Sequence, residues 1–315
     1  MLAHEGLAVQ IVDSGPLGAT IARTFPPHTR FFTSPERLSL FGLAIAPLHQ
    51  EKLTGEEYLA YLRQYVATHD LQVDTFTEIL SGARQPVKVV GRTLSGQRRV
   101  YSADTLVLAT GGTDRPRRLG VPGEDLPHVR SHLGDPHRYA GRRVVIVGGR
   151  NSAVESALRC YRVGAHVHLV HRRSHIHERV KFWLRPEVQS LLDEGVITGH
   201  LPGEVAEITP EAVVLSDGRR LEADDVVLQI GYEQDGALFD MFGVPRDGVR
   251  KAPVIDPDTM RAAEDLYVVG TATAGTQDRF EVLIENSHDH AGRVAAALAG
   301  RAAPSPRPAR PIPEV

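Results

Sequence analysis

Hydrophobic and polar positions follow two different periods along the chain, and together they predict an α/β fold. Apolar residues at helical spacing predict a helix over residues 56–68. Short apolar runs at 105–109 and 144–147 predict buried strands. The run at 8–12 predicts a further buried strand, which ends at Asp13.

Two stretches of short alternating segments predict antiparallel meanders. They cover residues 85–104, with a Ser-Gly turn, and residues 204–222, with an Asp-Gly turn. Each leads into a buried strand. The order of helix-bearing unit, meander and buried strand therefore occurs twice, which predicts two similar domains. The pattern ends with a strand, a Gly-rich turn and a helix over about 279–298.

Length, composition and charge indicate how many domains the chain forms and which partners are not expected. With 315 residues, 42% of them hydrophobic, the chain is long enough for two well-packed domains. A net charge of −3 gives no reason to expect nucleic acid or a membrane surface as a partner. No apolar run has the length of a membrane span and no secretory signal is evident, so we expect a cytoplasmic protein. The Pro-rich tail, 301–315, is expected to be disordered.

Cysteine and histidine usage argues against thiol or metal chemistry. Cys160 is the one cysteine, so no redox dithiol is possible within the chain, and we expect a small buried side chain. Histidines crowd residues 166–177, but no carboxylate or cysteine supports them. We therefore expect these histidines to face solvent and no metal to be bound.

The segment VVIVGGRNSA gives the clearest chemical signal. It places a glycine turn between a predicted strand and a predicted helix, as in a dinucleotide-binding unit. Gly148 permits the tight turn, and Ala153 occupies the last small position. Arg150 replaces the middle glycine of the motif, where it either hinders a phosphate or neutralises it. Asn151 or Ser152 is expected to cap the helix.

The strand that follows ends in His171-Arg172-Arg173, at the position where an NAD site carries an acid. Two guanidinium groups suit the 2′-phosphate of NADP(H), so we expect NADPH rather than NADH. The alternative interpretation is that these arginines belong to a solvated loop.

Several segments resemble one family of flavoproteins. VVIVGGRNSAVESAL, LVLATGGTDRPRRLGVPGEDLPHV and VVGTATAG resemble the two-dinucleotide-domain flavin reductases related to thioredoxin reductase. FFTSPERLSLFGL, HRRSHIHERVKFWLRPEV and FEVLIENSHDHAGRV are most similar to the bacillithiol disulfide reductase (YpdA-type) family. The resemblance covers residues 8–298.

The resemblance implies two Rossmann-like domains. Residues 1–117 and 249–300 would form a discontinuous FAD-binding domain, and 118–248 an inserted NADPH-binding domain. FAD would be bound by Asp13, Gly15, Thr110, Gly111, Gly270 and Thr271. NADPH would be bound by Gly148, Gly149, Arg150, Asn151, Ser152, Ala153, Glu155, His171, Arg172 and Arg173. A helix after Thr276 would direct its positive end at the flavin.

The implied activity is NADPH-dependent, FAD-dependent reduction of a small disulfide such as bacillithiol disulfide by a cytoplasmic homodimer. Hydride transfer between the cofactors requires no side-chain acid or base, so no catalytic residue is assigned. Phe32, Thr33, Ser34 and His288 are candidates for the substrate side. A flavin-dependent monooxygenase and a non-catalytic NADPH-binding remnant or redox sensor are the alternatives.

The sequence departs from the family at its beginning. A glycine-rich phosphate loop precedes the ribose-binding acid by about 20 residues, but only twelve residues precede Asp13. The first strand, that loop and the cysteine that the family carries in it would lie upstream of Met1. We expect that the sequence as given starts late; the alternative is a variant without this loop. As given, the chain should bind FAD poorly.

A second departure lies near the end of the chain. Thr271 follows the glycine after the final strand, where members of the family often have Asp.

Overall fold

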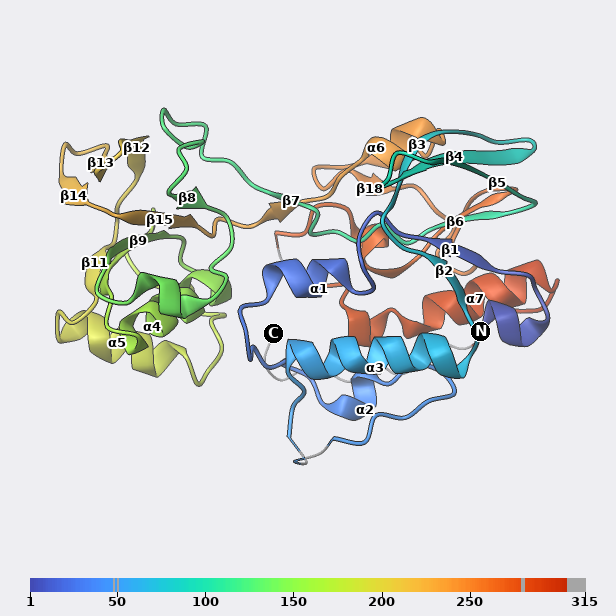
Figure 1. Ribbon diagram of the computed structural model, residues 1–315, viewed down its shortest axis with the longest axis horizontal. Helices are drawn as coiled ribbons and strands as arrows, with labels where there is room; N and C mark the ends of the chain where they lie inside the picture. The colour runs from blue at the N-terminus through green and yellow to red at the C-terminus, as the bar shows by residue number, and fades with distance from the viewer. Residues whose placement is uncertain (48, 50, 279–280, 305–315) are drawn as a thin grey trace. The chain divides into compact units, whose positions relative to one another are not determined.

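The computed structural model describes residues 1–47, 49, 51–278 and 281–304, and it confirms the predicted α/β fold. Most of the predicted tail, residues 305–315, lies outside the described residues. The chain divides into two compact units, shown with their elements in Figure 1. Unit 1 comprises Met1–Ala22, His28–Arg115 and the residues from Tyr232 on, whereas the described part of unit 2 comprises Arg23–Pro27 and Pro116–Gly231.

Unit 2 is built on a parallel sheet of five strands in the order β11-β10-β9-β15-β8. Its central strand β9 is the apolar run that the sequence predicted, and four of its five residues are buried. The strands are β8 (Val129–Arg130), β9 (Arg143–Val147), β10 (His166–Val170), β11 (Thr198–His200) and β15 (Asp225–Leu228).

Side chains that alternate along β9 pack on opposite faces of this sheet. Val144 and Ile146 join a core cluster with residues of helix α4 (Asn151–Arg162) and α5 (Arg185–Asp193). Val145 and Val147 join a second cluster with the predicted meander. The meander is β12 (Val205–Ile208), β13 (Ala212–Leu215) and β14 (Arg220–Glu222), and the helices lie on the other side of the sheet in Figure 1.

Unit 1 contains the long helix predicted near the start of the chain. Helix α3 covers Gly55–Thr68, one residue more than predicted. It begins with a capping box, in which Thr54 Oγ1 accepts from the Glu57 N–H at 3.2 Å and the Glu57 carboxylate accepts from the Thr54 N–H at 2.7 Å. Tyr58 and Tyr61 are buried on its inner face.

Three of the small sheets of unit 1 contain most of its remaining strands. The first predicted meander has an additional strand, β3, ahead of the two expected ones. The three sheets, with each strand's bounds, are β3 (Thr77–Ala83), β4 (Val87–Thr93) and β5 (Arg98–Ala103); β19 (Arg261–Ala263), β20 (Leu266–Val268) and β6 (Leu106–Leu108); and β1 (Gln10–Val12) with β2 (Gln72–Asp74).

The remaining elements are short. They are η1 (Leu2–Glu5), α1 (Ala19–Thr24), α2 (Pro35–Leu38), β7 (Arg115–Pro116), η2 (Pro136–Tyr139), β16 (Tyr232–Glu233), α6 (Ala237–Met241), β17 (Arg246–Asp247), β18 (Ala252–Pro253), η3 (Gly270–Ala274), η4 (Ile284–Asn286) and α7 (His288–Leu298).

The prediction of a buried strand at 8–12 was wrong in its burial. Strand β1 is only three residues long, and Ile11 is 38% exposed. Within the described residues β1 pairs with β2 alone, so its other edge has no neighbouring strand to cover it. An apolar run predicts burial only where both neighbours of the strand are present.

The last helix begins later than predicted. Arg279, where the prediction started, lies outside the described residues, and α7 begins at His288. The buried Gln277 side chain closes a loop instead, because its Oε1 accepts from the N–H groups of Glu281 and Val282 at 2.7 and 2.9 Å. Within the described residues, the helix predicted over about 279–298 therefore ends as predicted but starts later, at His288.

Residues 232–248 belong to unit 1 in this division, whereas the sequence placed them in the inserted domain. Packing explains the difference. Phe239, Phe242 and Val244 are buried in one cluster with Leu108 of β6 and Leu266 of β20.

Candidate functional site

The glycine turn after β9 leaves no space for side chains. Gly148 has φ of +144°, and a Cβ there would lie 2.4 Å from the Gln229 carbonyl oxygen and 2.8 Å from Ala153 Cβ. A Cβ on Gly149 would lie 2.4 Å from the ring of His171. Because β9 and β10 are parallel neighbours, their carboxyl ends bring this turn and His171 together.

Helix α4 begins differently from the prediction. Its N-cap is Arg150, whose side chain makes no capping bond, so neither Asn151 nor exposed Ser152 is the cap. Asn151 Oδ1 instead accepts from the main-chain N–H of Lys181 at 2.8 Å. The predicted cap was wrong because the Asn151 side chain is hydrogen-bonded to a segment 30 residues further along the chain.

The residues after β10 form a basic rim beside this turn. Arg172 and Arg173 are exposed, whereas His171 is half-buried. Burial, and then Arg173 and Arg172, lower the pKa of His171 to about 4, so its ring is neutral at pH 7. Its Nε2 is buried and has no hydrogen-bond partner among the described residues. A buried, unpaired ring nitrogen beside two guanidinium groups fits a polar, anionic ligand.

Glu155 lies one turn into α4, in a group of charges. The Lys181 ammonium donates to one carboxylate oxygen at 3.2 Å, and Arg159 donates to the other at 3.0 Å. The Lys181 side chain is only 6% exposed and also lies 5.6 Å from the centre of the Trp183 ring. These contacts hold the segment after β10 on α4.

Two further side chains of unit 2 bear on the sequence predictions. Cys160 is fully buried, as predicted, and burial raises the pKa of its thiol to about 12. His168, predicted to face solvent, is half-buried instead. It hydrogen-bonds to His200 at 3.1 Å, and Arg219 donates to the other ring nitrogen of His200 at 3.1 Å.

In unit 1, Asp13 follows β1 directly. Its Oδ1 accepts from the main-chain N–H of Gly15 at 2.8 Å, which closes a turn at the end of the strand. A Cβ on Gly15 would lie 2.6 Å from Ala19 Cβ, so this position has no room for a side chain.

The other two predicted turns of unit 1 meet. Strands β6 and β20 are parallel neighbours, so Gly111 and Gly270 follow them at the same edge of the sheet. The glycines have φ of +86° and +71°, which favour glycine. Thr110 Oγ1 is buried without a partner among the described residues, and a polar ligand group fits there. Thr271 follows Gly270 in the second turn.

Gln234, which the sequence analysis did not identify, bridges these two turns. Its Nε2 donates to the carbonyl oxygens of Gly111 and Ala272 at 2.9 and 2.8 Å. Its main-chain N–H donates to Thr276 Oγ1 at 3.1 Å.

The candidate substrate residues come from two segments that make contact. Thr33 is buried, Phe32 is half-buried, and Ser34 is the N-cap of α2. At the other end of α2, the Arg37 carbonyl accepts a hydrogen bond from His288 Nε2 at 2.8 Å. One turn earlier, burial raises the pKa of Glu285, a carboxyl that the sequence analysis did not identify.

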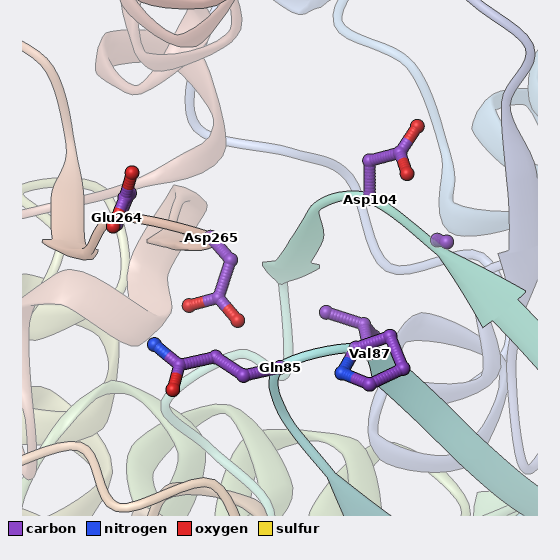
Figure 2. Close-up of a pocket in the computed structure, with 7 residues that line it drawn as sticks. Gln85, Val87, Asp104, Glu264 and Asp265 are labelled. Carbon is purple, nitrogen blue, oxygen red and sulfur yellow. The ribbon is translucent and has the colours of Figure 1, made fainter.

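A cavity of about 290 Å³ lies elsewhere in unit 1 and contains none of the predicted residues. Figure 2 shows the Asp265 and Asp104 carboxylates that line it pointing in different directions. Asp265 is held by Arg84 at 2.5 Å. No group of three or more metal-ligating side chains occurs among the residues that the structure describes.

Comparison with known proteins decides the family. A family model described as pyridine nucleotide-disulphide oxidoreductase matches residues 1–270. The chain belongs to this family. It is therefore an oxidoreductase, in a family whose members use a flavin and a pyridine nucleotide.

Individual relatives agree with this assignment. Bacilliredoxin reductase Bdr of Bacillus subtilis (strain 168) is 29% identical over 305 residues, which cover 95% of this chain and 93% of the relative. The solved structure of bacillithiol disulfide reductase Bdr (YpdA) from Bacillus cereus has a TM-score of 0.89 at 30% identity. The protein of that name from Staphylococcus aureus has a TM-score of 0.87 at 28% identity. In both, 95% of this chain and 93% of the other are covered.

More distant structures share the fold alone. Thioredoxin reductase of T. acidophilum has a TM-score of 0.68 at 18% identity, and a flavin-containing monooxygenase from Stenotrophomonas maltophilia has 0.65 at 18%. Among the described residues, no helix has the length and apolar character needed to cross a membrane.

Proposed function

We propose that the protein is an FAD-dependent reductase that oxidises NADPH and reduces a low-molecular-weight disulfide such as bacillithiol disulfide. The observation that carries the proposal is the similarity over 95% of the chain to bacillithiol disulfide reductase of Bacillus cereus. Unit 1 is proposed to bind FAD and unit 2 NADPH, in a cytoplasmic homodimer.

The proposed NADPH site uses the glycine turn and the basic rim of unit 2. Gly148 and Gly149 let the main chain approach the pyrophosphate, and the N-terminus of α4 favours its charge. Arg172 and Arg173 bind the 2′-phosphate, while His171 offers its unpaired ring nitrogen. The site is completed by Arg150, Asn151, Ser152, Ala153 and Glu155.

The proposed FAD site uses the carboxyl ends of β1, β6 and β20. Asp13 binds the adenosine ribose beside Gly15, and Thr110 and Gly111 lie against the flavin nucleotide with Gly270 and Thr271. When bound, the two cofactors supply hydride transfer from nicotinamide to flavin. The protein aligns them and excludes water.

The disulfide is proposed to bind beside Phe32, Thr33, Ser34 and His288. Cys160 takes no part, because a fully buried thiol with a raised pKa is neither accessible nor ionised at pH 7. The carboxyl of Glu285 lies one turn from His288, and burial raises its pKa.

Product analysis tests this proposal. The FAD-loaded protein is incubated with NADPH and bacillithiol disulfide under nitrogen and in air. We expect oxidation of one NADPH for each disulfide converted to two thiols, at the same rate in both atmospheres. Oxygen uptake with hydroxylation of a substrate would instead establish a monooxygenase. NADPH binding without turnover in the flavin-loaded protein would establish a non-catalytic sensor.

A further inference from the structure

Gln234 joins two parts of the chain that lie far apart in sequence. It follows strand β16, and both N–H groups of its side chain are used, one on the Gly111 carbonyl and one on the Ala272 carbonyl. These acceptors precede and follow it by 123 and 38 residues. A side-chain amide has only two N–H donors, so the side chain of Gln234 is fully committed as a donor to these turns.

The main chain around Gln234 is also held by hydrogen bonds and an ion pair. The main-chain N–H of Asp235 donates to an oxygen of Asp114 at 3.1 Å, and the Asp235 carboxylate pairs with Arg115 at 2.7 Å. Thr276 accepts from the N–H of Gln234. The main chain at Gln234 and Asp235 is therefore anchored as well, through Thr276 and Asp114, which follow the two turns.

The two turns pack closely where Gln234 bridges them. Gly112 is buried, and a Cβ there would lie 3.1 Å from the Thr271 carbonyl oxygen and 3.4 Å from that of Gly275. A small change in the separation of the turns thus changes the space at the carboxyl ends of β6 and β20.

The hydrogen bond to the Gly111 carbonyl also orients the peptide group that joins Gly111 to Gly112. A trans peptide is planar, so the N–H of Gly112 points away from the carbonyl that precedes it, and hence away from Gln234. Gly112 is buried, and among the described residues its N–H has no main-chain acceptor, while Thr110 Oγ1 has no partner. The Gly112 N–H, which points away from Gln234, and the Thr110 hydroxyl are therefore available to a polar group of a ligand.

We propose that Gln234 is a positioning residue for the flavin, which sets the spacing of the turns 110–112 and 270–274 and the direction of the Gly112 N–H. This inference rests on the proposed function, because it assumes that these turns bind FAD. Gln234 acts through the two turns and contacts their carbonyl groups.

The test compares Gln234→Met and Gln234→Glu with the unchanged chain. Methionine has a similar length and no donor, whereas glutamate presents a charged acceptor to two carbonyl oxygens. Gln189→Met is the matched control, because Gln189 is exposed on α5, where its side chain donates to Asp193 of the same helix. The measurements are the dissociation constant of FAD, the visible spectrum of the bound flavin, and the melting temperature of the cofactor-free protein.

We expect Gln234→Met to weaken FAD binding at least tenfold and to shift the flavin spectrum, Gln234→Glu to weaken it further, and Gln189→Met to change neither. Should Gln234→Glu not fold, Gln234→Met decides. Folded Gln234 variants with unchanged FAD affinity and spectrum would overturn the inference even if the melting temperature falls. If the unchanged chain binds no FAD, the proposed function fails as well.

Discussion

His171 Nε2 and Thr110 Oγ1 are among several buried side-chain atoms that have no hydrogen-bond partner in the described residues, and these two lie in turns that the sequence assigned to a nucleotide. Buried polar atoms in folded proteins are normally hydrogen-bonded, so such atoms point to a missing ligand or water. His171 directly follows β10, Thr110 lies two residues after the end of β6, and each strand has a parallel neighbour. At the residue scale, these atoms are the independent support for two nucleotide sites.

Replacement of Arg172 and Arg173 by alanine tests the choice between NADPH and NADH. Removing two charge-assisted contacts to the 2′-phosphate should raise the dissociation constant of NADPH by about 10- to 100-fold and leave that of NADH nearly unchanged. Calorimetric titration measures both constants. Arg220→Ala, at an exposed position of β14, controls for the loss of charge. Equal weakening of both nucleotides would contradict the assignment.

Cys160 is predicted to be inert. A thiol that is fully buried, with a pKa raised to about 12, should not react with a thiol reagent in the native protein at pH 8, and should react once the protein is unfolded. Cys160→Ala should keep full disulfide reductase activity and lose about 1 kcal/mol of unfolding free energy from the small cavity. Loss of activity in a folded Cys160→Ala protein would show that the thiol takes part.

The sequence could predict the residues whose function depends on local geometry. The tight turn at Gly148 and the burial of Cys160 follow from neighbours along the chain. Gln234 could not be predicted, since its role depends on carbonyl groups brought near it by tertiary structure. The prediction that Asn151 caps the helix was wrong for the same reason, because its side chain accepts a hydrogen bond from the main chain of Lys181.

At the element scale, the buried Lys181 ammonium pairs with Glu155 and helps to hold the segment after β10 on helix α4. Lys181→Met should lower the unfolding free energy by about 2 kcal/mol, because Glu155 loses the ammonium that pairs with its carboxylate and keeps the Arg159 contact. Amide hydrogen exchange should increase between residues 171 and 184, and NADPH should bind more weakly. Lys88→Met, at an exposed position of β4, is the control. Unchanged exchange in this segment would show that the ion pair does not hold it.

An ion pair at the amino ends of β9 and β15, between Arg143 and Asp224, should make the stability of unit 2 sensitive to acid. Hydrogen bonds from Arg143 lower the pKa of Asp224 from 3.8 to about 2. A lowered folded-state pKa stabilises the protein fully above pH 4, and this stabilisation is lost as the pH falls through 2. Asp224→Asn should therefore cost about 1 kcal/mol at pH 7, after allowance for partial exposure, and almost nothing at pH 2. Denaturant titrations at both pH values measure this; a cost that does not change with pH would contradict it.

Elements with a strong internal pattern were predicted best. Helix α3 and strand β9 carry their own periodicity and agree with the structure within one residue. Strand β3 was missed, and the exposure of β1 and the late start of α7 were predicted wrongly. These features depend on strand partners and on the Gln277 loop, which a local pattern does not contain.

At the scale of the whole molecule, the repeated pattern in the sequence and the two compact units describe the same organisation, with the chain leaving unit 1 after residue 115 and returning at 232. Each unit brings the carboxyl ends of parallel strands to one edge, and each proposed cofactor site lies at such an edge. The family assignment and the similarity over 95% of the chain agree with an oxidoreductase built on these two units.

The most direct test of the account is anaerobic reduction of the bound flavin. The chain is loaded with FAD, freed of unbound cofactor and mixed with NADPH in the absence of oxygen, while its visible absorbance is followed. The account predicts that the flavin is bleached by NADPH and much more slowly by NADH. A protein that retains FAD whose absorbance NADPH leaves unchanged would contradict it.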